Sequence, residues 1–364
     1  MFQTDYAVPT GDFIEEWLED HSMTQAELAR RTGVSPKHIS MVLSGAPVTA
    51  SFATKLALAT GVPAERWLAL ESTFRADQER LGMEAELAKK KDVAEPFSES
   101  LRYLRSIGVV RSNMRRPGQV LMELMAFFRV GSVDALTPKV LIPNARYLQS
   151  TSLTVQDASV ATWLRLAQMT VEASDPLPPY KSTKLQEALP EIRSMSGTFS
   201  TNPDAFIERL SSLGVHVVLQ EEIRGCRAYG ATFWTNGHPV IVLSVRGKTD
   251  GALWFSLFHE LGHVLLHPDS THIERRGKPS LTANLQAEED AANTFAEQTL
   301  IPLECRDDLY SIRSKSEVVA FASEQNVSPG VVMQHLHHFE KWDHSHGRGL
   351  YLSISLKETA PLED

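Results

Sequence analysis

The sequence predicts a multidomain α+β protein, in which an all-α helix-turn-helix domain and a helical middle region precede an α+β domain with a small sheet. The chain has 364 residues, enough for two or three domains of about 100–200 residues each. Up to residue 75 it consists of short helical segments with clear start and stop signals. After about residue 205, short β-like runs bounded by Gly, Pro and Asn precede a long apolar helical segment.

Composition narrows the class of protein. Hydrophobic residues make up 42% and charged residues 22%, which excludes collagen-like, low-complexity and wholly disordered chains. The apolar stretches 121–130 and 240–245 are too short or too charged to cross a bilayer, and the first residues lack the features of a secretory signal. With only two cysteines, Cys226 and Cys305, the chain cannot be a disulfide framework. We therefore expect a cytoplasmic protein without a membrane partner.

The net charge of −9 bears on the expected partners. Phosphate attraction needs clustered Lys and Arg, so the whole chain is not expected to bind polyanions indiscriminately. One small DNA-reading face is compatible with this charge.

We expect five segments along the chain. They are a helix-turn-helix domain at 8–75, a helical linker at 76–100, a mostly helical middle region at 101–204, an α+β domain at 205–345, and a C-terminal strand and tail at 346–364. Within 76–100 we expect a connecting helix and then a linker near Glu95 and Pro96.

Capping signals define two consecutive helices in the first domain. Thr24 and Glu27 form a capping box, with Thr24 as N-cap and Glu27 at N3, and the helix ends near Gly33, which can adopt positive φ. Ser35 as N-cap and Pro36 at N1 open the next helix. Other helices of this domain are expected at 13–18, 51–60 and 63–71.

The spacing of Gln25, Ala29, Gly33 and Ile39 is typical of two helices that cross steeply through a short turn, because Ala29 lets the second helix pass close to the first. Ile39 and Leu43 would bury the second helix, whose outward face would enter the major groove of DNA. The candidate DNA-binding residues are Gln25, Ser35, Pro36, Lys37, His38, Ser40 and Met41. Lys37 lies where base edges are read, whereas Gln25 and Ser35 could hold phosphates.

Two observations keep an alternative open. An ordinary helical bundle can match the same spacing, and acidic residues dominate the first helix, namely Asp12, Glu15, Glu16, Glu19 and Asp20. We interpret these acids as a solvated face that points away from DNA.

Residues 8–75 resemble the XRE-type helix-turn-helix in its HigA-antitoxin-like variety. The resemblance is carried by Val8-Pro9-Thr10-Gly11, Ser22-Met23-Thr24-Gln25-Ala26-Glu27-Leu28-Ala29, Gly33-Val34-Ser35 and Trp67-Leu68. It implies a homodimer that binds operator DNA, and it suggests neutralisation of a toxin as a second function.

In the α+β domain, strands are expected at 214–220, 228–234 and 239–245, and a helix at 254–267 contains His259-Glu260-Leu261-Gly262-His263. Two histidines at i and i+4 share one helical face and can bind one metal ion. Glu260 could take the proton of a water molecule that attacks a carbonyl carbon. The alternative is a core helix whose histidines bond to neighbouring groups.

The next helix, expected at 287–300, offers the third ligand. Glu289, Ala292 and Ala296 share a face, and the small residues would let this helix approach the first. Glu288, His267 and His272 remain alternative ligands, and Glu289 could instead be a solvated acid near a helix start. Leu266 and Asp269 stand where a metzincin needs Gly and His, so that class is excluded.

The C-terminal part contains several candidate oxyanion donors, and the sequence does not favour one of them. Helices are expected at 318–326 and 329–339 and a strand at 351–356, and the segment 338–346 could bind stray metal. The candidate donors to a transition-state oxyanion are His335, His337, His338, Tyr229 and Tyr351.

Residues from about 205 to 340 resemble the ImmA/IrrE metallopeptidase family. The matching pieces are Tyr229-Gly230-Ala231-Thr232, Trp254-Phe255-Ser256-Leu257, His259-Glu260-Leu261-Gly262-His263, Leu265-Leu266-His267, Glu289 with Ala292-Asn293 and Phe295-Ala296, Leu300-Ile301-Pro302 and Val327-Ser328-Pro329-Gly330. The resemblance implies a zincin-like fold, Zn²⁺ bound by His259, His263 and Glu289, and Glu260 as general base. The sequence departs from the family in one place, since Ala291 replaces the second Glu of Glu-x-Glu-Ala-Asn.

Together the two resemblances imply a DNA-binding transcriptional regulator with a zinc-dependent metalloendopeptidase domain. Its substrate would be a repressor-like regulatory protein, or the chain itself near 89–95, in a stress, mobile-element or defence response. One alternative is a non-hydrolytic sensor that acts as a transcription factor, although the presence of Glu260 argues against it. The other is a HigA-like antitoxin that represses its operon and neutralises a toxin.

Overall fold

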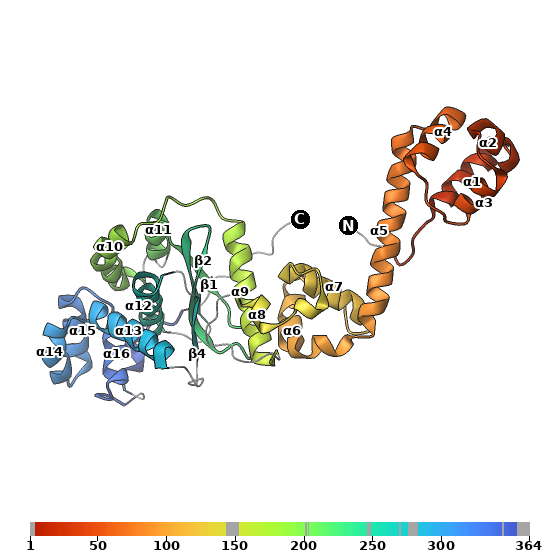
Figure 1. Cartoon of the computed structure of the whole chain (residues 1–364). Helices are drawn as coiled ribbons and strands as arrows, with labels where there is room; N and C mark the ends of the chain where they lie inside the picture. The colour runs from red at the N-terminus through yellow and green to blue at the C-terminus, as the bar shows by residue number, and fades with distance from the viewer. Residues whose placement is uncertain are drawn as a thin grey trace. The chain divides into compact units, whose positions relative to one another are not determined.

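The computed structural model describes residues 4–142, 153–200, 202, 204–245, 249–268, 271–275, 283–343 and 346–354. The chain, traced in Figure 1, divides into two compact units. The N-terminal unit comprises Met1–Asp92 and Ser112–Met122, and the C-terminal unit comprises Val93–Arg111 and Glu123–Asp364. Among the described residues, no helix is both long and apolar enough to span a membrane.

The N-terminal unit is built from helices. They are α1 (Thr10–Asp20), α2 (Gln25–Thr32), α3 (Pro36–Leu43), α4 (Ala50–Thr60) and α5 (Ala64–Ala88). The core between them is formed by Ile14, Leu18, Leu28, Ala29, Ile39, Val42, Phe52, Leu56 and Trp67. Gly33 ends α2 with φ of 65°, a conformation that suits glycine. Gly11 lets α1 pass against the end of α3, because a Cβ atom there would lie 2.6 Å from the carbonyl oxygen of Leu43.

Two local expectations for this part of the chain need correction. The Thr24 side chain accepts the N–H of Glu27, but the Glu27 carboxylate pairs with Arg30 and Arg31 instead of completing a capping box. These arginines lie one turn further along α2, within reach of an i,i+3 and an i,i+4 ion pair.

The second correction concerns the linker expected near Glu95 and Pro96, which is helical in the structure. Helix α5 runs on to Ala88, and the segment Lys91–Phe97 then forms a 3-10 helix. Phe97 is fully buried and packs on Phe128 with 5.5 Å between ring centroids, which fixes the segment to the C-terminal unit.

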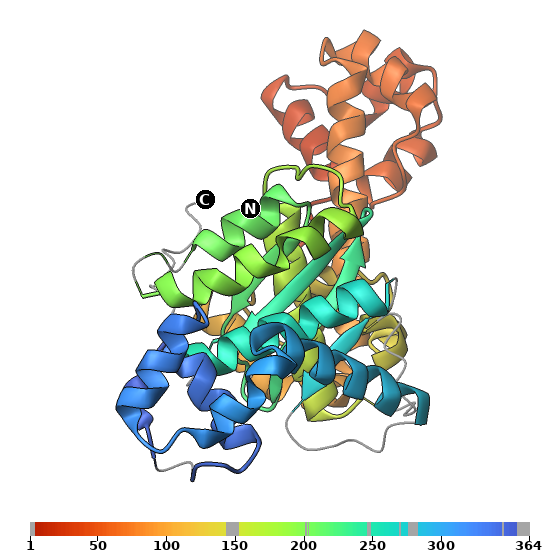
Figure 2. The same ribbon diagram turned by 90° about the vertical axis from the view of Figure 1, so that its left-hand side faces the viewer.

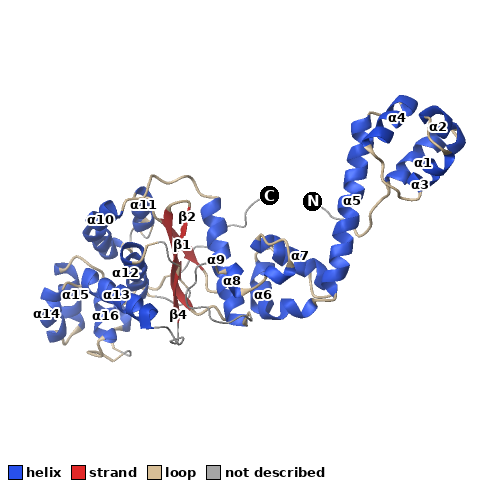
Figure 3. Cartoon of the chain, viewed as in Figure 1, coloured by secondary structure: helices blue, strands red, loops and turns tan. Residues whose placement is uncertain are grey.

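All strands that the described residues form lie in the C-terminal unit (Figure 3). The strands are β1 (His216–Gln220), β2 (Ala228–Thr235), β3 (His238–Ser244) and β4 (His272–Arg275), in the order β1-β3-β2-β4. Strand β1 is parallel to β3, whereas β2 is antiparallel to both β3 and β4. Asn236 and Gly237, both with positive φ, make the tight turn between β2 and β3. The multidomain α+β class is therefore confirmed.

Helices cover both faces of this sheet. Helix α12 (Asp250–Leu266) packs on β2 and β3 from one side, together with α13 (Ala283–Leu300) and α16 (Pro329–His338), and α9 (Val155–Glu172) lies on the other side (Figure 1). Figure 2 looks onto the first group of helices, with the strands behind them. The other helices are α6 (Ser98–Ser106), α7 (Pro117–Phe128), α8 (Pro138–Leu141), α10 (Ser182–Ser194), α11 (Ala205–Ser212), α14 (Arg306–Ser311) and α15 (Lys315–Glu324).

Close packing of α12 against α13 is what positions the candidate site. A Cβ atom on Gly262 would lie 3.2 Å from the Cα of Ala292, so the two small residues set the separation of the helices. Of the strand expected at 351–356, the described part forms one isolated bridge, between Ser353 and Thr249. Residues 355 and 356 lie outside the described part of the chain.

Candidate metal centre and nucleic-acid interface

Three nitrogen and oxygen donors meet between α12 and α13. The Nε2 atoms of His259 and His263 are 3.1 Å apart, and the Glu289 carboxylate lies 3.3 Å from the first and 3.5 Å from the second. Tetrahedral zinc with bonds of about 2.0–2.1 Å requires donors separated by about 3.3–3.4 Å. The chemistry and spacing of these donors therefore fit zinc.

Asn293 orients the first histidine of this group. It lies one turn after Glu289 on α13, and its Oδ1 is 2.9 Å from Nδ1 of His259. If Nδ1 carries the proton and donates it to the amide oxygen, Nε2 presents its lone pair toward Glu289. Metal-binding histidines in proteins commonly have an outer partner of this kind.

Glu260 is held against strand β2. Its side chain is fully buried, and Oε2 accepts a 2.6 Å hydrogen bond from the Thr232 hydroxyl. Its other oxygen, Oε1, has no hydrogen-bond partner among the described residues. Gly230 makes room for it, because a Cβ atom there would lie 2.5 Å from Oε1. A buried carboxylate oxygen without a partner is costly, and water or a cation in the site would satisfy it.

A third carboxylate enters the site from β4. Donor atoms of Glu274, Glu260 and His259 lie within 4.8 Å of one another. Burial alone would lower the pKa of His259, but the charges of Glu274, Glu289 and Glu260 outweigh it and raise that pKa to about 9. In the metal-free protein a proton on His259 thus offsets part of the negative charge that a divalent cation would neutralise.

Burial and neighbouring charges also shift the pKa values of Glu260, His263 and Glu289. Burial raises the pKa of Glu260 to about 8, against the opposing charge of His259. Burial likewise lowers the pKa of His263 to about 4. For Glu289, burial acts to raise the pKa, but hydrogen bonds with His259 and His263 outweigh it and hold the pKa well below its usual range.

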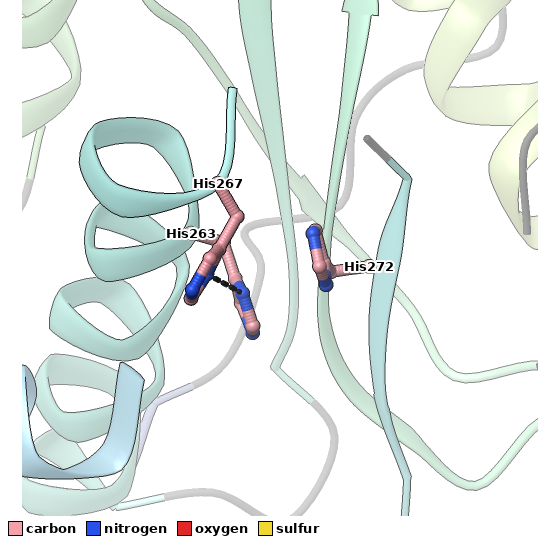
Figure 4. Close-up of side chains that lie close together, drawn as sticks. All are labelled: His263, His267 and His272. Atoms are coloured by element: carbon pink, nitrogen blue, oxygen red, sulfur yellow. Dashed lines mark hydrogen bonds between the residues drawn. The ribbon is translucent and has the colours of Figure 1, made fainter. Parts of the chain in front are cut away.

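Two of the alternative ligands, His267 and His272, lie beside His263. Figure 4 shows His263, His267 and His272 close together, with a hydrogen bond between the first two. Nε2 of His272 in turn lies 3.9 Å from the carboxylate of Glu288. The structure thus places Glu289 against both His259 and His263, and Glu288 beside His272.

The candidate oxyanion donors of the C-terminal part have partners elsewhere. The ring nitrogens of His335 face the backbone carbonyls of Val331 at 3.1 Å and Glu297 at 3.3 Å, and His338 pairs with Glu297 at 3.0 Å. His337 bonds through Nδ1 to the Tyr351 hydroxyl at 2.9 Å. Tyr229, the remaining candidate, is half-buried on β2. Within the segment 338–346, residues 344 and 345 lie outside the described part of the chain.

On helix α3, the exposed side chains include Lys37, Ser40 and Met41. His38 is expected near or on the outward face of α3. It is half-buried, and its ring meets the edge of Phe52 with 4.8 Å between centroids, because α4 packs beside the start of α3. His38 is therefore less exposed than Lys37, Ser40 and Met41.

The remaining DNA-binding candidates lie at helix starts. Gln25 is the exposed first residue of α2. The Ser35 hydroxyl accepts the N–H of His38 and caps α3, and Pro36 is its first residue. Val42 rather than Leu43 is the second fully buried residue of α3 beside Ile39.

Sequence reasoning gave no role to Glu274, Thr232 and Asn293. The first two lie on strands at even spacing from other site residues, Glu274 two residues after His272 and Thr232 two after Gly230. That period of two, which puts side chains on one face of a strand, is the signal that could have found them.

A cavity of about 540 Å³ lies between α9 and the sheet. Its lining includes Glu172, His216, Phe233 and His238, and none of the metal-centre residues. It is separate from the site described above.

Comparison with known families bears on both units. A family model described as IrrE N-terminal-like domain, of the Peptidase_M78 family, matches residues 212–337. A helix-turn-helix model matches residues 14–67. No curated protein matches the chain. Peptidase_M78 domains are generally zinc-dependent, in agreement with the donor set between α12 and α13. The chain thus joins an XRE-type helix-turn-helix to an IrrE/ImmA-like Peptidase_M78 domain.

Proposed function

We propose that this chain is a transcriptional regulator whose Peptidase_M78 domain is a zinc-dependent endopeptidase. His259, His263 and Glu289 would hold the zinc ion, and Glu260 would act as general base. The observation that carries the proposal is the buried Oε1 of Glu260, which lacks a hydrogen-bond partner among the described residues. The Glu260 carboxylate also has a donor atom within 4.8 Å of His259, which belongs to the His-His-Glu donor set. A site that only stored a metal would gain nothing from a buried carboxylate at this place.

The chemistry follows from the positions of these groups. When bound, zinc would act as a Lewis acid that polarises a peptide carbonyl and lowers the pKa of water. Glu260 accepts the proton of the attacking water at Oε1 and returns it to the leaving amine. The Thr232 hydroxyl fixes the other oxygen of the same carboxylate, so that Oε1 keeps one position through both transfers.

We infer that the substrate is a second protein rather than this chain. The segment considered for self-cleavage, 89–95, overlaps the 3-10 helix Lys91–Phe97, in which Ala94 and Phe97 are buried. A peptidase acts on an exposed, flexible backbone, and this segment would have to unfold first. The helix-turn-helix in the same chain favours a substrate that controls transcription, such as a repressor.

For the N-terminal unit we propose operator binding by a homodimer, with α3 in the major groove. The exposed Lys37 and Ser40 support this assignment. The five acids of α1 are exposed, as expected for a face directed to solvent.

The proposal is tested with the purified full-length chain loaded with zinc. It is incubated with proteins encoded by neighbouring genes, and cleavage is followed by gel and by mass spectrometry of the new termini. We expect wild type to cleave one of them and the Glu260→Gln variant to lose cleavage by about 10²–10⁴-fold, since an amide cannot accept the proton.

Two other results would redirect the proposal. Zinc-loaded wild type that cleaves none of these proteins, together with a Glu260→Gln variant that regulates normally in cells, would indicate the non-hydrolytic sensor. A stable complex with a small toxin that is never cleaved would indicate the antitoxin.

A further inference from the structure

His263 is contacted by two histidines besides His259. Its Nδ1 lies 3.2 Å from Nδ1 of His267, and its ring stacks on that of His272 with 3.9 Å between centroids and 11° between planes. Figure 4 shows the three side chains together. His263 belongs to α12, His267 is the C-cap residue of α12, and His272 is the first residue of β4.

We propose that His267 and His272 are positioning residues for His263. His267 would fix which ring nitrogen of His263 faces the zinc ion, and His272 would fix the plane of the ring. This inference rests on the proposed zinc site.

The role of His267 follows from proton placement. A histidine that binds a metal through Nε2 carries its proton on Nδ1. That N–H points at Nδ1 of His267, which can accept it when His267 holds its own proton on Nε2. If the His263 ring turned over, it would lose this bond and withdraw Nε2 from Glu289.

The backbone makes this contact available. His267 is the C-cap of α12, with φ of −131° and ψ of 57°, and its N–H still bonds to the carbonyl of His263 at 2.9 Å. The residue is thus tied to the last turn but has left the helical conformation. Because α12 ends here, the orienting group comes from the same helix as the residue that it orients.

His272 acts from the neighbouring strand. It is only 3% exposed, and its ring covers one face of the His263 ring. This parallel stacking restricts rotation of the His263 ring about its Cβ–Cγ bond, because the ring would collide with His272 as it turned.

The rival interpretation is a second metal site, since donor atoms of these histidines lie within 4.8 Å of one another. The stacking argues against it. The lone pair of an imidazole nitrogen lies in the plane of its ring, and the rings of His263 and His272 are nearly parallel. Their lone pairs therefore do not converge on one ion.

Paired variants of the full-length protein test the proposal. His267→Ala removes the acceptor and His267→Gln restores one; His272→Ala removes the stacked ring and His272→Phe keeps a ring that cannot bind metal. Zinc affinity is measured by chelator competition, site geometry by the visible spectrum of bound Co²⁺, and folding by the melting temperature of the metal-free protein.

We expect His267→Ala and His272→Ala to bind zinc about 10–100-fold more weakly than wild type, the usual effect of losing an outer partner. His267→Gln and His272→Phe should recover most of the affinity and the wild-type Co²⁺ spectrum. Every variant that binds zinc should bind one ion per chain.

The possible failures are distinguishable. Wild type that binds no zinc would refute the proposed function itself. Wild type and both alanine variants with equal affinity, even if the variants melt earlier, would overturn the positioning role alone. Two ions in wild type and one in His272→Phe would replace it with the three-histidine metal site.

Discussion

The hydroxyl of Thr232 donates a 2.6 Å hydrogen bond to Oε2 of Glu260, and both groups are buried. The bond joins strand β2 to the helix that carries the two metal-binding histidine candidates. It leaves Oε1 as the one oxygen of Glu260 that lacks a partner among the described residues. One side chain of the sheet therefore decides which oxygen of the proposed base is available.

Thr232→Val tests this relationship, because valine has nearly the shape of threonine but no hydroxyl. A hydrogen bond to a charged group contributes about 1.5–3 kcal/mol, so we expect hydrolysis to fall by about 10–100-fold. Zinc affinity should stay within a few-fold of wild type. Thr232→Ser, which keeps the hydroxyl, is the matched control. Equal activity of wild type and the valine variant would contradict the role of the bond.

The metal centre also predicts how zinc binding depends on pH. The pKa of His259 is about 9 in the metal-free protein, so at pH 7 this histidine is protonated and must lose its proton to bind zinc. His263, with a pKa of about 4, is already neutral. Zinc affinity should therefore rise at least tenfold per pH unit from pH 6 to 8, and more steeply if Glu260 also loses a proton, before it levels off above pH 9.

Calorimetry in buffers of different ionisation enthalpy measures the released protons. We expect at least one per zinc ion, from His259, and up to a second from Glu260, whose pKa of about 8 would fall beside a cation. Release of no proton at pH 7 would contradict this account. His259→Ala with His263→Ala should abolish stoichiometric zinc binding altogether.

The sequence predicts the parts of this site that depend on helical spacing. Histidines four residues apart share a helix face, and the structure has their Nε2 atoms 3.1 Å apart. The small residues Ala292 and Gly262 allow the next helix to bring Glu289 to them.

Other parts depend on pairings that no local spacing encodes. Glu274 reaches the site because β4 pairs with β2 at the edge of the sheet, a register set by tertiary packing. His38 is half-buried because Phe52 of another helix packs against its ring. Of the capping box predicted at Thr24 and Glu27, only the Thr24 bond forms, because Arg30 and Arg31 pair with the Glu27 carboxylate.

For DNA binding, Lys37→Ala removes the exposed cation near the start of α3. If Lys37 reads a base, operator affinity should fall by about 1–3 kcal/mol and preference at one position should relax. If it contacts only phosphate, all sequences should weaken alike, with a smaller dependence on salt. Glu16→Ala, on the exposed acidic face of α1, is the control and should not weaken binding. Unchanged affinity of the Lys37 variant for an identified operator would contradict the placement of α3 in the groove.

Gly230→Ala probes the space around the proposed base. The new Cβ would lie 2.5 Å from Oε1 and 3.0 Å from Cγ of Glu260, too close for either atom to stay in place. The backbone cannot readily withdraw, because Gly230 is paired with Leu243 on β3 and with Glu274 on β4. We expect a loss of about 1–3 kcal/mol in the free energy of unfolding, as for other overpacked sites. Hydrolysis should fall by at least tenfold through the displaced carboxylate.

A double-mutant cycle separates this clash from a general weakening of the sheet. In a Glu260→Ala background the side chain that the new methyl group meets is gone, so Gly230→Ala should cost less than half as much stability as in wild type. Gly82→Ala, at a helical glycine with open space around its Cβ position, is the control and should leave hydrolysis unchanged. Equal costs in both backgrounds, measured by denaturant unfolding, would show that Gly230 serves the strand rather than Glu260.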